Sequence, residues 1–252
     1  MTFRVVIPAR YGSERLPGKP LADIHGKPMI VRVAEAVARS SAAEVVVATD
    51  DERILSVVEA VGFEAEMTRT DHASGSDRVM EVVSARGWGD DDIVLNVQGD
   101  EPQIPPAVLE QLAQSLVQEP LVASATLCEP VQSFEALLDP NVVKVVRAVD
   151  QRALYFSRAP IPYGRDLFDE TVGRLPAQGR WWRHIGVYGY RCWALEKFVG
   201  LPMGRLEALE KLEQLRLLEN GMEMRVLEAC EAVPGGIDTP EDLDRVRALL
   251  AP

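Results

Sequence analysis

The first half of the sequence alternates apolar runs with amphipathic stretches, and this alternation limits the fold more than any other feature. Runs typical of buried strands lie at residues 3–7, 44–49, 64–68, 93–97 and 121–127. Stretches with helical spacing lie between them, at residues 29–39, 52–61 and 105–119, with a further helix ending near residue 87. Such βαβ units build a mostly parallel sheet with helices on both faces. The sequence therefore predicts a doubly wound, Rossmann-like α/β fold.

In a fold of this class, the loops that follow the carboxyl ends of the strands form the rim of the ligand site. The expected loops are residues 8–20, 49–51, 72–78 and 98–102. The first loop is rich in glycine and proline, which stop regular structure and let the backbone approach a ligand closely. We therefore expect the ligand site at this edge of the sheet.

The loop at residues 8–20 also carries the cations Arg10, Arg15 and Lys19. Clustered cations repel one another unless an anion lies among them, so a triphosphate is the expected ligand. The loop is not a P-loop, because five residues separate its glycines and a proline follows Lys19. Side-chain cations and scattered amides would then hold the phosphates. The alternative is an ordinary surface loop with solvated charges.

The net charge of -12 argues against a nucleic-acid-binding protein, because such proteins carry a basic face. The 3 cysteines lie far apart, which indicates no disulfide framework and suits a reducing compartment such as the cytoplasm. No apolar run approaches the length of a membrane span, so we expect no membrane insertion. A strand pattern begins at residue 3, so we also expect no signal peptide.

The pattern changes near residue 129, although residues 1–252 are expected to form one domain. Antiparallel strands are predicted at residues 142–149 and 153–156, followed by an irregular basic and aromatic region. We interpret residues 129–190 as an inserted antiparallel lobe. Its tryptophans suit either contact with a partner subunit or substrate, or a small aromatic core of its own.

One helix is predicted over residues 205–219. Leu206, Leu209 and Leu217 share a face of that helix, and Glu213 falls within the same face. A carboxylate in such a place must be paired or must face a polar cavity. Leucines on the other side leave the core face of this helix open, so Glu213 is a candidate site residue on this pattern alone.

Two further helices begin with clear capping signals. Asp51 is the expected N-cap of the helix at residues 52–61, and Thr239 that of the closing helix, with Asp242 completing a capping box. Because Thr239 does the capping, Asp238 is left for another role; the alternative is that it complements the helix dipole. Asp238 and Asp100 are isolated acidic residues, and carboxylates beside bound phosphates are the usual ligands of Mg²⁺.

A series of motifs, taken in chain order, resembles those of the 3-deoxy-D-manno-octulosonate (Kdo) cytidylyltransferase family, whose members are also called CMP-Kdo synthetases. The matching segments are residues 8–20, 48–50, 72–78, 96–102, 155–158, 183–190, 212–216 and 236–242. The ordered set is specific and covers essentially the whole chain. The resemblance implies a nucleotidyltransferase fold and the reaction CTP + Kdo → CMP-Kdo + pyrophosphate, which serves lipopolysaccharide biosynthesis.

The resemblance also implies roles for individual residues. The triphosphate would be held by Arg10, Ser13, Arg15 and Lys19, with Arg15 and Lys19 countering charge on the leaving pyrophosphate. The cytidine would be surrounded by Ala9, Thr49, Asp50, Ser74, Gly75 and Arg78. Mg²⁺ would be held by Asp100 and Asp238. The Kdo pocket would be lined by Gln98, Arg158, His184, Tyr188, Glu213 and Gln214.

The chain departs from the family pattern at two places. Residues 76–78 read Ser-Asp-Arg where the family often has Thr-Glu-Arg, so Asp77 is expected to cap a helix and not to contact ligand. Residues 163–182 match poorly, and no role is carried over to Arg165 or Trp181. Family members are homodimers, and residues 129–190 are the expected dimer lobe.

Two alternatives stay open from the sequence. The first is a cytidylyltransferase for another acidic sugar, such as 8-amino-Kdo or a sialic acid. The second is a non-catalytic nucleotide-binding protein on the same fold, against which the presence of both Asp100 and Asp238 argues.

Overall fold

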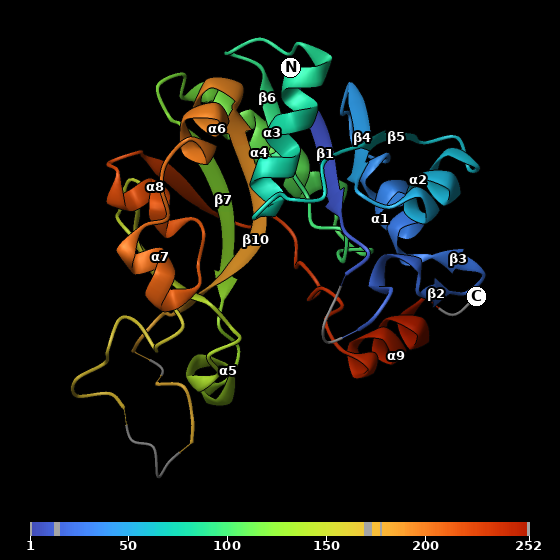
Figure 1. Cartoon of the computed structure of the whole chain (residues 1–252). Helices are drawn as coiled ribbons and strands as arrows, with labels where there is room; N and C mark the ends of the chain where they lie inside the picture. Colours follow the sequence, from blue (N-terminus) through green and yellow to red (C-terminus); the bar gives the residue numbers. More distant parts are fainter. Residues whose placement is uncertain (1, 13–15, 169–172, 177, 251–252) are drawn as a thin grey trace.

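The structure is a computed structural model that describes residues 2–12, 16–168, 173–176 and 178–250 (Figure 1). A nine-stranded sheet has the main order β11-β7-β10-β6-β1-β4-β5, and β8 and β9 extend it beside β10. Its strands are β1 (Arg4–Ala9), β4 (Glu44–Thr49), β5 (Glu64–Met67), β6 (Ile93–Asn96), β7 (Ser124–Pro130), β8 (Lys144–Arg147), β9 (Ala153–Ser157), β10 (Trp182–Arg191) and β11 (Met224–Glu228). A separate small sheet pairs β2 (Asp23–Ile24) with β3 (Lys27–Pro28).

Helices cover both faces of the large sheet, as the alternating pattern predicts. The helices in the described part of the chain are the 3₁₀ helix η1 (Lys19–Leu21) and the α-helices α1 (Met29–Val37), α2 (Glu52–Glu59), α3 (Gly75–Arg86), α4 (Pro106–Gln118), α5 (Phe134–Leu138), α6 (Cys192–Val199), α7 (Arg205–Glu210), α8 (Leu215–Glu219) and α9 (Pro240–Leu249). One core packs α1, α2 and α4 on one face, and a second packs α3, α6 and α8 on the other. Figure 1 shows α6, α7 and α8 grouped on the left and α9 beneath β2 and β3.

Strand β1 lies at the centre of the parallel part of the sheet. It pairs in parallel with β4 on one side and β6 on the other. Val5, Val6 and Ile7 have no exposed surface, because helices cover both faces there. This arrangement confirms the predicted α/β fold and places the carboxyl ends of β1, β4 and β6 at one edge.

Strand β10 is the main departure from a parallel sheet. It lies between β6 and β7 and is antiparallel to both. The expected lobe boundary at residue 190 therefore falls inside a strand of the main sheet. The segment that leaves the sheet runs between β9 and β10, and Figure 1 shows it reaching away at the lower left beside α5.

The aromatic residues of this lobe form a small core of their own. Trp181 is only 4% exposed and packs with Phe134 of α5 and with Phe168. Its indole nitrogen donates a hydrogen bond to the carbonyl of Pro162 at 2.8 Å. Of the two interpretations of the aromatic side chains, the satellite core applies to Trp181.

The prediction of one helix over residues 205–219 is wrong. Helix α7 ends at Glu210, because Lys211 adopts a left-handed conformation with φ of 54°. Helix α8 begins four residues later and folds back, and the buried ion pair between Glu207 and Arg216 joins the two helices at 2.6 Å. Leu209 is consequently 80% exposed and does not share a core face with Leu217. Periodicity along the chain does not register such a break, since the partners that stabilise it are charged.

Candidate active site

Two adjoining pockets open at the edge where β1 and β6 end. The larger, of about 520 Å³, is lined by Pro8, Ala9, Arg10, Gly12, Lys19, Pro20, Gln98, Gly99, Asp100 and Asp238. The smaller, of about 200 Å³, is lined by Pro8, Ala9, Arg10, His72, Ala73, Ser74, Gly75, Arg78 and Gln98. Four residues line both pockets, so one elongated ligand can occupy the two together. The loops predicted to form the rim supply most of these side chains.

The floor of the larger pocket depends on two glycines that allow close backbone approach. A Cβ atom at Gly99 would lie 3.0 Å from the carbonyl oxygen of Pro8, and one at Gly236 would lie 2.9 Å from Glu101. The amide of Ile237 donates to the carbonyl of Asp100 at 2.9 Å. These contacts bring the segment before α9 against the loop after β6, so that two acidic motifs far apart in sequence meet.

Lys19 lies between the two acidic motifs. Its ammonium donates to Asp100 Oδ2 at 2.5 Å and to Asp238 Oδ1 at 2.9 Å. Burial lowers the pKa of Lys19, but attraction to Asp100 outweighs burial and the pKa is raised overall. Burial likewise raises the pKa of Asp100, and Lys19 opposes this shift only in part. The one positive charge of Lys19 is therefore shared by two carboxylates at the bottom of the pocket.

The capping prediction explains why Asp238 reaches this pocket. Thr239 caps α9 and forms the predicted capping box with Asp242. The backbone amide of Asp238 donates to the Asp242 carboxylate at 3.2 Å, which leaves the Asp238 side chain directed at Lys19.

Glu101, beside Asp100, is a group that the sequence did not single out. Burial and the neighbouring Asp100 raise its pKa to about 8.

The donor set at Asp100 and Asp238 suits a hard divalent cation. Both carboxylates direct one oxygen at a single positively charged atom, Lys19 Nζ, which stands in for such a cation. Within the described ranges, no group of three or more His, Cys, Asp or Glu residues is close enough to complete a metal site. Two carboxylates fit Mg²⁺, which takes one or two protein oxygens and completes its shell with water and phosphate.

The smaller pocket is built around the first turn of α3. Ser74 caps this helix and forms a capping box with Asp77, which confirms the predicted capping role of Asp77. Arg78 is 4% exposed, and its guanidinium donates to Asp50 Oδ2 at 2.7 Å and to Thr68. Among the described lining residues are Ser74, Gly75 and Arg78 but not Asp50, which instead holds Arg78 in place.

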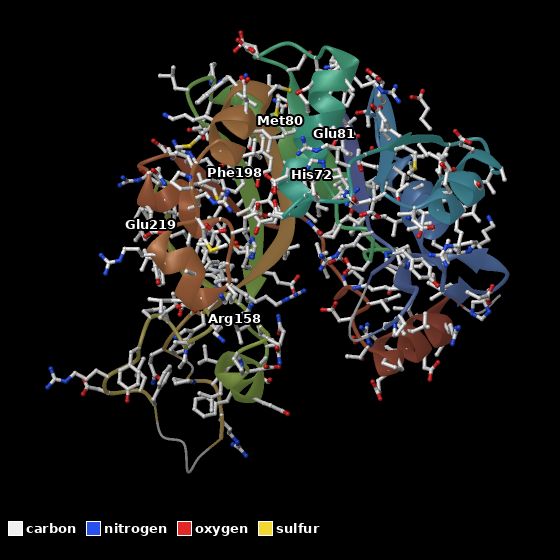
Figure 2. The ribbon with its side chains drawn as sticks, viewed as in Figure 1. His72, Met80, Glu81, Arg158, Phe198 and Glu219 are labelled. Atoms are coloured by element: carbon white, nitrogen blue, oxygen red, sulfur yellow. The ribbon has the colours of Figure 1, made fainter. Side chains whose placement is uncertain are left out.

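Thr49 also supports the pocket from behind. It has no exposed surface, and its carbonyl accepts hydrogen bonds from the backbone amide and the hydroxyl of Thr68. His72 lines the same pocket and contacts Glu81 through Nε2, and Figure 2 shows the two side by side at α3.

A third group of predicted residues lies on β10. His184 and Tyr188 have ring centroids 5.4 Å apart. The Thr126 hydroxyl lies 3.0 Å from His184 Nε2 and close to two backbone carbonyls, so its one hydrogen goes to a carbonyl and Nε2–H donates to Thr126. Burial, with Arg183 nearby, lowers the pKa of His184 to about 3. The imidazole is therefore neutral at physiological pH, with Nδ1 as an acceptor.

Glu213 and Gln214 lie in the turn between α7 and α8. Ser76 Oγ donates to Glu213 Oε2 at 3.2 Å. Glu213 Oε1 and Gln214 Nε2 are both buried, and neither has a hydrogen-bond partner among the described residues. Buried polar atoms without partners are rare in folded proteins, and they mark places where a ligand or water completes the structure. The predicted Glu213 thus reaches a buried polar position by a turn and not by a helix face.

Arg158, a predicted sugar-binding residue, uses its guanidinium for hydrogen bonds to backbone carbonyls of the protein. Its Nε donates to the carbonyl of Glu210 at 2.7 Å and its Nη1 to that of Pro140 at 2.9 Å. Figure 2 shows it in the lower part of the view, below His72. Arg158 therefore anchors the end of α7, and a ligand would have to compete with those carbonyls. Ser13 and Arg15 lie outside the described residues.

Comparison with known proteins agrees with the fold. The cytidylyltransferase family model matches residues 4–224. A cytidylyltransferase from Leptospira borgpetersenii, 17% identical, superposes with a TM-score of 0.61 over 98% of this chain and 85% of its own, which bears on the fold alone. The class that fold and site define is that of the cytidylyltransferases.

Closer relatives refine this class. The 3-deoxy-manno-octulosonate cytidylyltransferase of Saccharophagus degradans is 52% identical over 99% of both chains, and that of Cellvibrio japonicus is 53% identical over 99% of this chain and 98% of its own. The solved structure of CMP:2-keto-3-deoxy-manno-octonic acid synthetase complexed with CTP is 46% identical, with a TM-score of 0.90 over 100% of this chain and 99% of its own. The chain therefore belongs to the 3-deoxy-manno-octulosonate cytidylyltransferase family, which confirms the resemblance of its motifs.

Proposed function

We propose that this protein transfers CMP from CTP to the anomeric hydroxyl of Kdo, giving CMP-Kdo and pyrophosphate for lipopolysaccharide biosynthesis. The observation that carries this proposal is the pair of adjoining pockets. One is lined by both positive and negative side chains around Lys19, and the other is built on the first turn of α3. Their sizes and linings suit a triphosphate and a nucleoside. The identity to a synthetase solved in complex with CTP supports the same assignment.

The larger pocket would hold the triphosphate. Arg10 and Lys19 line it and supply positive charge, and we assign the same role to Ser13 and Arg15. The smaller pocket would hold cytidine against Ala9, Ser74, Gly75 and Arg78, with Thr49 and Asp50 behind Arg78. We assign Gln98, Arg158, His184, Tyr188, Glu213 and Gln214 to the sugar-acid pocket. The buried Glu213 Oε1 and Gln214 Nε2 support this, since sugar hydroxyls would give them partners.

Asp100 and Asp238 would hold Mg²⁺ beside the α-phosphate. When bound, the metal would supply positive charge where charge builds up during phosphoryl transfer. The anomeric oxygen of Kdo forms a bond to the α-phosphorus, the bond from that phosphorus to the bridging oxygen breaks, and the hydroxyl proton is released. Lys19, already within 2.5 Å of Asp100, is placed to counter charge on the departing pyrophosphate.

Pyrophosphate release with CTP and a panel of acidic sugars tests the proposal. Turnover should require a divalent cation, and Kdo should exceed 8-amino-Kdo and a sialic acid in kcat/KM by about tenfold or more. Replacing CTP by UTP serves as the control for base recognition. If Kdo is among the poorest acceptors, the specificity is wrong; if no acceptor releases pyrophosphate, the protein is not a transferase.

We also propose that the protein works as a homodimer in the cytoplasm. The lobe carries exposed apolar side chains, among them Val149 at 105% and Tyr163 at 70% exposure, which a second copy would cover. Both substrates are water-soluble, and no helix in the described part of the chain is long and apolar enough to span a membrane. Light scattering at micromolar concentration would give twice the mass of one chain; a mass of 27.8 kDa would contradict the dimer.

A further inference from the structure

One turn of α3 contacts two different parts of the site. Ser74 and Gly75 line the smaller pocket. Ser76, the next residue, is 2% exposed and points the other way, where its hydroxyl donates to Glu213 Oε2 at 3.2 Å. Ser76 and Glu213 are separated by 137 positions in the sequence, so only the fold brings them together.

The Ser76 hydroxyl is held in this orientation from its other side. The buried Tyr190 of β10 interacts with Ser76 through its hydroxyl. A serine hydroxyl has one hydrogen to give, and the hydrogen bond to Glu213 Oε2 uses it, because a carboxylate oxygen can only accept. Ser74 also interacts with the Glu213 carboxylate, but its Oγ is shared with Asp77 Oδ2, 2.9 Å away within the capping box.

The hydrogen bond from Ser76 makes the two carboxylate oxygens of Glu213 different from each other. Oε2 is engaged by Ser76, while Oε1 is buried with no hydrogen-bond partner within the described residues. A buried carboxylate costs free energy unless its oxygens are bonded, so Oε1 has a strong preference for a donor such as a sugar hydroxyl. Without Ser76, Oε2 would lose this hydrogen bond and the carboxylate would be held less firmly.

We infer that Ser76 is a positioning residue for the acceptor sugar: it fixes Glu213 so that Oε1 faces the acceptor's hydroxyl group. This inference rests on the proposed function, because it places Glu213 in the sugar-acid pocket. It assigns Ser76 no contact with either substrate. The nucleotide is held by Ser74 and Gly75 on the same turn, and removing the Ser76 hydroxyl leaves those residues unchanged.

Steady-state kinetics on Ser76→Ala, Ser76→Thr, Glu213→Gln and the Ser76→Ala/Glu213→Gln pair test the inference. Ser76→Ala should raise KM for the acceptor by about tenfold and change KM for CTP by less than about twofold. Ser76→Thr keeps the hydroxyl and should restore the acceptor KM. Because Ser76 acts through Glu213, the double variant should be no worse than Glu213→Gln alone. Ser84→Ala, at an exposed position on the same helix, is the matched control.

Several outcomes would overturn the inference. Equal rises in both KM values would mean a general disturbance of α3, and additive effects in the double variant would mean that Ser76 acts without Glu213. Should Ser76→Ala fail to fold, Ser76→Cys keeps a weak donor and should give an intermediate acceptor KM. An acceptor KM for Ser76→Cys equal to that of the wild type would also contradict the inference. Wild-type turnover in the same assay separates the two claims: an inactive wild type removes the proposed function and this inference with it, whereas an active wild type with an unaffected Ser76→Ala removes the inference alone.

Discussion

The proposed phosphate pocket and the proposed sugar pocket differ in how their buried polar groups are paired. At the phosphate end, Lys19 is bonded to both Asp100 and Asp238, so the charges are satisfied without ligand. At the sugar end, Glu213 Oε1 and Gln214 Nε2 are buried without partners in the described part of the chain.

This difference decides whether a ligand must displace existing contacts or supplies missing ones when it binds. A triphosphate must compete with existing ion pairs, and it gains only the excess of the new contacts over the old. In the proposed assignment, a sugar acid would give the buried Glu213 and Gln214 atoms the hydrogen bonds that they lack, so its binding would offset a cost that the folded protein already bears. The first end therefore stabilises the ligand-free fold, and the second end destabilises it in return for recognition.

The largest expected effect tests the phosphate end. Asp100→Asn and Asp238→Asn should each lower kcat/KM by about a thousandfold, because each removes a charge aimed at the place where Lys19 lies and the proposed metal would be held. Circular dichroism should show an intact fold in both. Asp244→Asn, on the exposed side of α9, is the control and should keep normal turnover. Near-normal activity in both site variants would remove the metal assignment.

The next effect is the pH dependence of stability at the sugar end. The pKa of His184 is about 3 in the folded protein and about 6.5 when unfolded, so below about pH 6.5 the unfolded chain binds the extra proton. Stability should therefore fall as the pH falls, by about 2 kcal/mol at pH 5 from this group alone.

Urea unfolding at pH 7 and pH 5 measures this contribution. His184→Gln cannot take up the proton, so its loss of stability between the two pH values should be smaller than that of the wild type by about 2 kcal/mol. His25→Gln, at an exposed histidine, is the matched control. Equal losses in wild type and His184→Gln would show that His184 is not held neutral.

The smallest expected effect is on stability, and it tests directly whether the two pockets differ in how their buried groups are paired. Gln214→Met should raise the free energy of unfolding of the ligand-free protein by about 1 kcal/mol, because it removes an unpartnered buried amide. Lys19→Met should lower it by about 1 kcal/mol, because two carboxylates lose their shared partner. Both substitutions introduce the same side chain, so opposite signs in denaturant unfolding would distinguish the two ends. Changes of the same sign would show that the ends do not differ in this way.

Much of the local structure is readable from the chain. The strand at residues 44–49 has the predicted bounds, and Asp51, Thr239 and Asp242 cap their helices as expected. These features depend on neighbours within a few residues, and spacing and capping signals report them directly. The break at Lys211 and the position of β10 between two strands of the main sheet were not predicted, because contacts between separate elements decide them.

By itself, the sequence determined the alternation of strands and helices in the first half of the chain, the loops that form the rim, and the family to which the motifs point. Only the tertiary structure decided which of those residues meet. Lys19 and Asp238 are 219 positions apart, and Ser76 and Glu213 are 137 apart, so their hydrogen bonds exist only once the sheet has formed. Partners, burial and the resulting pKa shifts are properties of groups that are neighbours in space, and a linear pattern carries no record of them.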